Sequence, residues 1–257
     1  MVFHIIPDIP LLFLLLLLPS PSSTAATNIL LTGEILPTDT QLSTPNAAFR
    51  IHNDCNLALY NPTLRFQSNT GNLRTNNCTL TLTRRGQLLI QAPNGSTIWS
   101  SSPPTKTGRY AALLRSDGHV AIYGPSVWST PYQRSAGVAE LGKYSPSPNA
   151  RNHMFSSQVL YDNSKLASGE HALAMKDDCG LELVKESEGV VWESGTKGKG
   201  RNCFVRLDHR GQLAVVDDRF KVVWASKAAE ADGFYVLVVH NDGRAAVYGP
   251  AIWSTNT

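Results

Sequence analysis

The stretch GPSVWST, Gly124–Thr130, returns as GPAIWST, Gly249–Thr255, 125 residues further along the chain. Each copy joins a Gly-Pro turn to a short apolar run that ends in Trp-Ser-Thr. The cysteines keep nearly the same offset, as Cys55 and Cys78 followed by Cys179 and Cys203. An offset that stays this constant indicates two copies of one domain.

A shorter repeat of about 32 residues lies inside each copy. Its units pair a Gly-containing turn with an alternating apolar run, as in RRGQLLIQ at Arg84–Gln91 and SDGHVAIY at Ser116–Tyr123. One aromatic residue closes each unit, and the six are Phe66, Trp99, Trp128, Trp192, Trp224 and Trp253. We therefore expect each domain to be a triplet of similar units.

The local pattern predicts β-strands throughout. Short runs rich in β-branched and aromatic residues are bounded by Gly, Asn and Asp, as in QLAVV at Gln212–Val216. Helical periodicity over eleven or more residues is nearly absent. About twelve short strands per domain, grouped in threes, predict an all-β chain with three small antiparallel sheets per domain and the tryptophans at the centre.

Composition divides the chain into four segments. Residues 1–26 contain the run Leu14–Leu18 and end in small residues, which is typical of a secretory signal peptide, although Lys and Arg are absent from it. A membrane anchor is the alternative, but the run is short for a bilayer. Residues 27–134 and 158–257 are the two domains, joined by a linker at 135–157 that is rich in Pro, Ser and Gly and is a candidate processing site. We expect a secreted or vacuolar protein.

The charge and the cysteines exclude several classes of partner. The formal net charge is +3, but the arginines are scattered and export is expected, so nucleic acid is not predicted. No stretch after residue 26 is as long and as free of charges as the first apolar run, so membrane insertion is not predicted. In an oxidising compartment the cysteine spacing predicts the disulfides Cys55–Cys78 and Cys179–Cys203, each worth about 3 kcal/mol. Without a CxxC pair or clustered His, no metal or other cofactor is predicted. Sequons at Asn77 and Asn94 allow N-glycans.

The stretch HNDCNLALY, His52–Tyr60, is the strongest candidate for a site. In an extended strand alternate side chains share a face, and one face would carry His52, Asp54, Asn56, Ala58 and Tyr60. The core-facing set would be Cys55, Leu57 and Leu59. A carboxylate beside an amide can satisfy one sugar hydroxyl as both donor and acceptor, which favours carbohydrate binding. A solvated strand face without a ligand is the alternative.

The chain resembles the monocot mannose-binding lectins, the bulb-type family with the β-prism II fold, in its two-domain form. The resemblance covers residues 28–257, from NILLTGEIL at Asn28–Leu36 to the paired GPSVWST and GPAIWST endings. It implies two tandem β-prism II domains, each of three short antiparallel sheets with pseudo-threefold symmetry. It also implies exchange of strands between domains, for which GPAIWST and FYVLVVH at Phe234–His240 are the candidates.

The resemblance assigns roles within the family motif Q-x-D-x-N-x-V-x-Y. Asp54 and Asn56 match the pair that holds the 2-hydroxyl of mannose, and Tyr60 matches the phenol that bonds the 4-hydroxyl. His52 and Ala58 replace the Gln and the Val, which predicts weakened mannose binding.

The other five copies of the motif are more altered. Two keep only the acid and the phenol and are candidate weaker carbohydrate sites, namely Asp117 with Tyr123 and Asp242 with Tyr248. The remaining three lack the phenol, and we do not expect them to bind sugar.

The function predicted from these patterns is a defence-related, non-catalytic lectin for terminal or clustered mannose on glycans or glycoproteins. The alternative is a lectin-related storage, taste-modifying or protein-interaction homologue that has lost sugar binding. An enzyme is disfavoured because no G-x-S-x-G motif and no convergent acid–base set is present. Since weak sites gain from multivalency, a homo-oligomer or an assembly of associated cleaved chains is expected.

Overall fold

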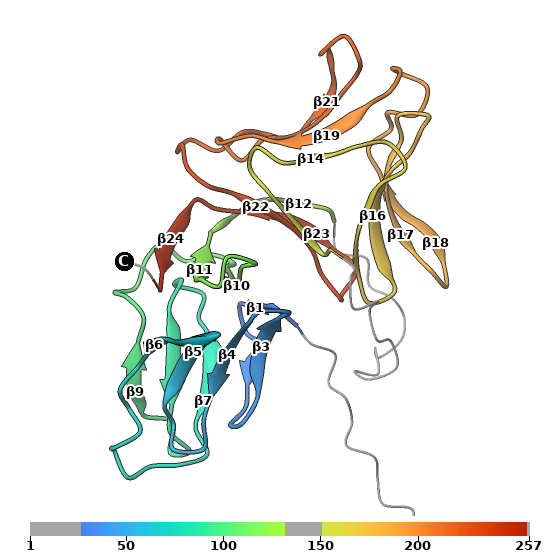
Figure 1. Cartoon of the computed structure of the whole chain (residues 1–257). Helices are drawn as coiled ribbons and strands as arrows, with labels where there is room; N and C mark the ends of the chain where they lie inside the picture. The colour runs from blue at the N-terminus through green and yellow to red at the C-terminus, as the bar shows by residue number, and fades with distance from the viewer. Residues whose placement is uncertain (1–26, 132–150, 256–257) are drawn as a thin grey trace, which may run out of the picture.

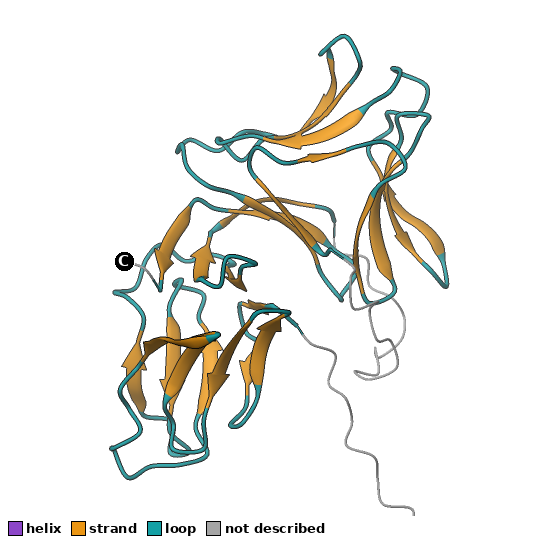
Figure 2. Ribbon diagram, viewed as in Figure 1, coloured by secondary structure: helices purple, strands orange, loops and turns teal. Residues whose placement is uncertain are grey.

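The computed structural model describes residues 27–131 and 151–255. Within these ranges the chain forms 24 strands and no helix (Figure 1, Figure 2). The strands make six four-stranded antiparallel sheets, so the all-β prediction with three sheets per domain is confirmed. The predicted signal peptide at 1–26 and the part of the predicted linker at 132–150 lie outside the described residues.

Three sheets form a unit that we call the first prism. In hydrogen-bonded order their strands are β2 (Ile35–Leu36), β7 (Thr79–Leu82), β8 (Leu88–Gln91) and β9 (Thr97–Ser100); β3 (Gln41–Thr44), β4 (Ala47–Ile51), β5 (Leu57–Asn61) and β6 (Thr63–Gln67); and β1 (Ile29–Leu31), β10 (Ala111–Leu114), β11 (Val120–Tyr123) and β24 (Ala251–Ser254). Strand β4 shows the expected period of two, because alternate residues from Ala47 to Ile51 are buried.

Three further sheets form the second prism. In the same order their strands are β14 (Val159–Leu160), β19 (Phe204–Leu207), β20 (Leu213–Val216) and β21 (Val222–Ala225); β15 (Lys165–Ser168), β16 (His171–Met175), β17 (Leu181–Lys185) and β18 (Gly189–Glu193); and β12 (Ser126–Ser129), β23 (Ala245–Tyr248), β22 (Val236–Val239) and β13 (His153–Phe155). Strand β13 lies inside the segment predicted as linker at 135–157, so this part of that prediction is wrong.

The two prisms exchange their last strands. Strand β24, from the end of the chain, pairs with β11 of the first prism, and β12, from the end of the first repeat, pairs with β23 of the second prism (Figure 1). Each exchanged strand follows a glycine with positive φ, 141° at Gly124 and 146° at Gly249. A Cβ atom at Gly124 would lie 2.5 Å from the Tyr110 ring, so only glycine fits this turn.

Of the two segments predicted to be exchanged between the domains, one is exchanged. GPAIWST contains β24 and is exchanged. FYVLVVH contains β22, which lies between β23 and β13 in the interior of its own sheet, so this expectation is wrong.

Aromatic rings fill the centre of each prism, as the repeat predicts. In the second prism Trp128, Trp192 and Trp224 meet edge to face, with centroid separations of 5.8, 5.8 and 5.9 Å. In the first prism Phe66 contacts Trp99 at 6.0 Å and Trp253 at 6.2 Å. Because Trp128 and Trp253 lie on the exchanged strands, each centre contains one ring from the other repeat.

A third apolar cluster joins the prisms. Strands β10, β11, β22 and β23 are buried along their whole length, since one face packs on a prism core and the other on the opposite prism. The cluster contains Tyr123 and Tyr248 among its buried residues. Two of the candidate site phenols are therefore part of the contact between prisms.

Both predicted disulfides are confirmed. Cys55–Cys78 has a Cα–Cα distance of 5.3 Å, and Cys179–Cys203 has one of 5.1 Å. The described part of the chain contains no helix with the length and apolarity that crossing a membrane requires. Among the same residues no group of three or more His, Cys, Asp or Glu side chains is placed to hold a metal ion.

Candidate functional site

The predicted site begins in a tight turn rather than in an extended strand. The His52 N–H donates to the Asn56 carbonyl at 2.9 Å, and the Cys55 N–H donates to the His52 carbonyl at 2.9 Å. Cys55 has a φ of 68°, in the left-handed region, and β5 starts only at Leu57. The prediction of one pleated face from residue 52 to 60 is therefore wrong for its first half. The predicted core side is confirmed, because Cys55, Leu57 and Leu59 are fully buried.

The turn presents the carboxylate of Asp54 at the surface. One oxygen, Oδ1, accepts the N–H of Asn56 at 3.0 Å, which fixes the carboxylate in the turn. The other oxygen, Oδ2, faces Gly71, where an added Cβ atom would lie only 2.5 Å away. The glycine at position 71 thus preserves the space beside the second oxygen.

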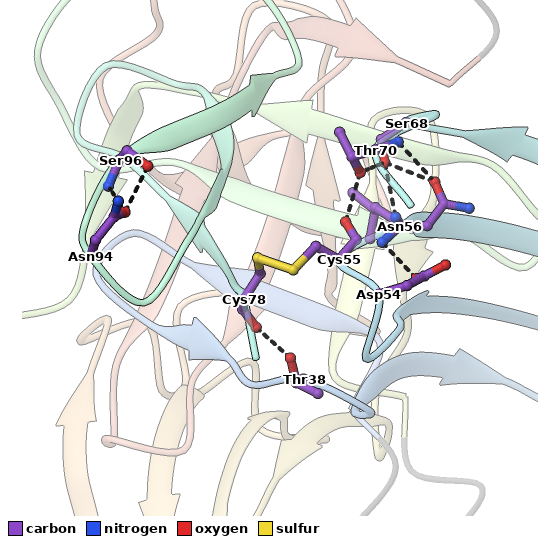
Figure 3. Close-up of a disulfide and its surroundings, with 10 residues drawn as sticks. Thr38, Asp54, Cys55, Asn56, Ser68, Thr70, Cys78, Asn94 and Ser96 are labelled. Atoms are coloured by element: carbon purple, nitrogen blue, oxygen red, sulfur yellow. Dashed lines mark hydrogen bonds between the residues drawn. A yellow bond between two sulfur atoms is a disulfide. The ribbon is translucent and has the colours of Figure 1, made fainter. Parts of the chain in front are cut away.

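The amide of Asn56 is oriented by two donors. Its Oδ1 accepts the Ser68 hydroxyl at 3.2 Å and the Thr70 N–H at 3.4 Å (Figure 3). Since a backbone N–H can only donate, the oxygen must face Thr70, and the Nδ2 donor is turned away from this contact. The Thr70 hydroxyl donates in turn to the Cys55 carbonyl at 2.6 Å, so the disulfide, the turn and the amide form one rigid unit.

His52 and Tyr60 form the second pair of the site. The imidazole Nε2 lies 3.1 Å from the Tyr60 hydroxyl, and the two rings meet edge to face at 6.0 Å. This hydrogen bond holds the phenol, and it engages one ring nitrogen of His52, the residue that replaces the Gln of the family motif. Ala58, predicted on the same face, is only 1% exposed, so a sugar cannot reach it in this conformation.

The second prism repeats the turn without the same chemistry. Asp178 Oδ1 accepts the Gly180 N–H at 2.9 Å, and the Thr196 hydroxyl donates to the Cys179 carbonyl at 2.6 Å, as in the first prism. The Gly180 N–H bond holds the pKa of Asp178 below its usual value. Position 180 has no amide side chain, and Lys197, the counterpart of Gly71, places its ammonium 3.2 Å from Asp178 Oδ2. The free carboxylate oxygen of the first prism is therefore neutralised in the second.

The candidate weaker site at Asp117 and Tyr123 is covered by the second prism. Tyr123 is 1% exposed, and its ring packs on Phe155 at 5.9 Å. Arg115 stacks over the same Phe155 ring at 5.4 Å and pairs with Asp117 at 2.7 Å. Burial raises the pKa of the Tyr123 phenol, which Arg115 partly offsets. The structure therefore brings the acid close to an arginine and buries the phenol.

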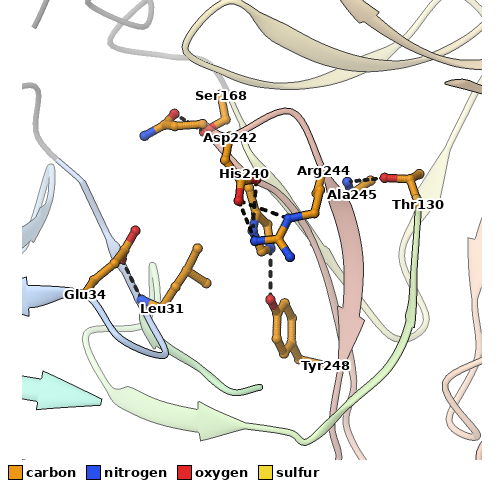
Figure 4. Close-up of polar contacts among 10 residues, drawn as sticks. Leu31, Glu34, Thr130, Ser168, His240, Asp242, Arg244, Ala245 and Tyr248 are labelled. Carbon is orange, nitrogen blue, oxygen red and sulfur yellow. Dashed lines mark hydrogen bonds and ion pairs between the residues drawn. The ribbon is translucent and has the colours of Figure 1, made fainter. Parts of the chain in front are cut away.

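The candidate weaker site at Asp242 and Tyr248 also lies at the contact between prisms. Tyr248 is 2% exposed, and its hydroxyl lies 3.0 Å from His240 Nε2 (Figure 4). Burial, together with the nearby charge of Arg109, lowers the pKa of His240 to about 4. Asp242 Oδ2 accepts the Arg244 Nε–H at 3.0 Å, and burial raises the pKa of this carboxyl.

Sequence reasoning missed the supporting residues Ser68, Thr70 and Gly71. Their signal was present, because a Ser-x-Thr triplet precedes the second cysteine of both repeats, at Ser68–Thr70 and Ser194–Thr196. The next residue differs between the repeats: Gly71 leaves Asp54 open, whereas Lys197 forms an ion pair with Asp178.

No family model matches the chain. Individual proteins do match. The chain is 48% identical over 253 residues to mannose-specific lectin 2 of Crocus vernus, and the match covers 95% of this chain and 94% of that protein. It is 42% identical over 253 residues to mannose-specific lectin 2 of Colocasia esculenta, covering 96% of this chain and 94% of that one. The chain belongs to the family of monocot mannose-specific lectins.

The structure of a relative shows the same arrangement in two domains. The agglutinin of Scilla campanulata, described as a fetuin-binding protein and a two-domain lectin, aligns with a TM-score of 0.78 and 28% identity. The match covers 89% of this chain and 99% of the agglutinin. Membership of the lectin family and the β-prism fold, both expected from the family resemblance, are confirmed.

Proposed function

We propose that this chain is a non-catalytic lectin that binds mannose-containing glycans through Asp54, Asn56 and Tyr60. The observation that carries the proposal is the fixed pair of an open carboxylate oxygen on Asp54 and an outward amide on Asn56. The relatives named as mannose-specific lectins, at 40–48% identity over most of the chain, support mannose as the sugar.

The two groups suit a sugar hydroxyl. A hydroxyl both donates and accepts, so it can donate to Asp54 Oδ2 and accept from Asn56 Nδ2 in one position. A bond to a carboxylate is stronger than a bond between neutral groups. Because Ser68, Thr70 and the Cys55–Cys78 disulfide already hold the turn, little ordering is required on binding.

We further propose that the chain has a single mannose site. Asp178 is paired with Lys197 and lacks an amide neighbour, which argues against binding at the equivalent turn. Tyr123 and Tyr248 are buried, and Asp117 and Asp242 are paired with arginines, which argues against the two candidate weaker sites.

Affinity chromatography on immobilised mannose tests the proposal. The unmodified protein should be retained and eluted by free mannose, and Asp54→Ala should not be retained. Asp178→Ala is the matched control, because it removes the same residue from the same turn of the second prism, and it should be retained like the unmodified protein. Retention of Asp54→Ala would contradict the assignment.

The second candidate is a lectin homologue without sugar binding, used for storage, taste modification or protein interaction. The bond between His52 and Tyr60 and the burial of Ala58 favour it, since both restrict the site. This candidate predicts that the unmodified protein passes through the mannose column unretained.

The setting of the protein is also a proposal. The signal-peptide pattern in the sequence of residues 1–26 and the two disulfides support export into an oxidising compartment, and we propose a secreted or vacuolar destination and a role in defence. One site per chain supports a homo-oligomer or associated cleaved chains, because clustering multiplies weak affinity. Sedimentation of purified protein as a lone chain at micromolar concentration would contradict the oligomer.

A further inference from the structure

The last motif of each prism contains the same pair of basic residues in opposite order. The first prism has Arg115 before Asp117 and His119 after it, whereas the second has His240 before Asp242 and Arg244 after it. The phenol therefore meets a guanidinium in the first prism, at 3.4 Å from Arg115, and an imidazole in the second. The two motifs form different surroundings at the contact between prisms.

The side chain that lies across the prism boundary from the phenol differs between the two motifs. In the first prism the Phe155 ring, from the opposite prism, covers Tyr123 and Arg115. The residue equivalent to Phe155 in the other repeat is Leu31, which faces the group around Tyr248 across the boundary (Figure 4). A leucine is smaller than a phenylalanine and offers no ring face to an arginine.

Two cavities adjoin at this boundary. One has a volume of about 310 Å³ and the other of about 150 Å³, and both are lined by Arg109, Arg244 and Tyr248. The larger is also lined by Ser126, Ser129 and Thr130, and the smaller by Leu31 and Arg84. The larger volume lies at the lower end of the range of small-molecule sites, so it suits one sugar unit.

The charge at the cavities is positive. The described lining residues include Arg84, Arg109 and Arg244 but no Asp or Glu. Arg244 is paired with Asp242, whereas neither Arg84 nor Arg109, both exposed, forms an ion pair within residues 27–131 and 151–255.

The acidic residues near the cavities do not cancel this positive charge. Glu34 lies on the Leu31 side, where its carboxylate accepts the Leu31 N–H at 2.7 Å, and burial raises its pKa. Asp242 is bonded by Arg244, and the charge of Arg109 also lowers its pKa against the effect of burial. Arg84 and Arg109 therefore remain to receive an anion, while the exposed Ser129 hydroxyl can meet a neutral hydroxyl group.

We propose that the two adjoining cavities together bind an acidic sugar unit, a pyranose that carries a carboxylate or a sulfate group. Arg109 and Arg84 bind the anionic group in the smaller cavity, and the exposed hydroxyl of Ser129 contacts the sugar hydroxyls in the larger one. The site is separate from the turn at Asp54 and does not depend on mannose binding there.

Isothermal titration with methyl glucuronide, glucose 6-sulfate, methyl glucoside and inorganic sulfate tests the proposal. The two acidic sugars should bind more tightly than the neutral glucoside and the free anion, and their affinity should fall with added NaCl. Arg109→Gln should weaken acidic-sugar binding about tenfold, as expected for loss of a charge-assisted hydrogen bond. Arg219→Gln removes an exposed arginine from a turn remote in sequence and should leave the affinity unchanged.

Leu31→Phe is the sharper variant, because it copies the arrangement at Phe155. The ring should fill the smaller cavity and abolish binding without changing the thermal unfolding midpoint. Asp54→Ala should bind acidic sugars normally, so that failure of the mannose site and failure of this one are distinguishable. Equal affinity for glucuronide and glucoside, sulfate binding as tight as that of the sugars, or unchanged affinity in both Arg109→Gln and Leu31→Phe would overturn the proposal.

Discussion

Replacing Trp253 with alanine should destabilise the first prism, although residue 253 ends the second sequence repeat. Strand β24 places Trp253 beside Ile122 of β11, and its ring contacts Phe66 at 6.2 Å in the centre of the first prism. The residue packs against the first core rather than the second. The substitution should therefore destabilise the first prism, although β22 and β23, which precede Trp253 in the sequence, belong to the second prism.

The expected loss is about 3 kcal/mol of unfolding free energy. Truncation of a buried aromatic residue to alanine costs about 3–5 kcal/mol, and Trp253 is only partly buried, which places it at the lower end. Trp128→Ala is the matched variant, because Trp128 closes the centre of the second prism, 5.8 Å from both Trp192 and Trp224. It should destabilise the second prism by a similar amount.

Hydrogen exchange followed by mass spectrometry separates the two effects. In Trp253→Ala, peptides that contain β7 and β8 should exchange about a hundredfold faster, while peptides that contain β19 and β20 change little. Trp128→Ala should give the reverse pattern. Faster exchange of β19 and β20 in Trp253→Ala, with β7 and β8 unchanged, would refute the strand exchange.

Three further predictions follow from the site and the prism contact. Gly71→Lys should abolish retention on mannose, because the new ammonium copies the pairing of Lys197 with Asp178; Gly71→Ala should weaken retention less. The double variant Cys55→Ser, Cys78→Ser should lose about 3 kcal/mol of unfolding free energy in urea titrations and bind mannose more weakly, since the disulfide anchors the turn. The pKa of His240 is about 4 in the folded state, against an ordinary value of 6.5. This difference favours the folded state by about 3 kcal/mol above pH 6.5, and that contribution is lost as the pH falls toward 4. In His240→Gln the unfolding free energy should therefore depend less on pH between 6.5 and 4.

The sequence was sufficient to predict the number and type of sheets. The offset between the repeats, the six spaced aromatics and the cysteine spacing each reflect the packing of one prism, which is local to a repeat. The exchange could be suggested only by resemblance, because GPSVWST and GPAIWST are nearly the same sequence and either copy can pair with either prism. The choice depends on where the Gly-Pro turn directs the strand.

The site was predicted in composition but not in geometry. Alternation places Asp54 and Asn56 on one face, but it cannot show that Cys55 takes a positive φ and turns the chain between them. The burial of Tyr123 and Tyr248 depends on contact between the two prisms, which no pattern within one repeat contains. The roles of Ser68 and Thr70 depend on long-range hydrogen bonds in the same way.

The most direct test of the account is a crystal structure of the chain soaked with methyl α-mannoside. We expect one sugar per chain, at the turn of the first prism, with a hydroxyl between Asp54 Oδ2 and Asn56 Nδ2. Sugar bound only elsewhere, or equally at the turns of Asp54 and Asp178, would contradict the account.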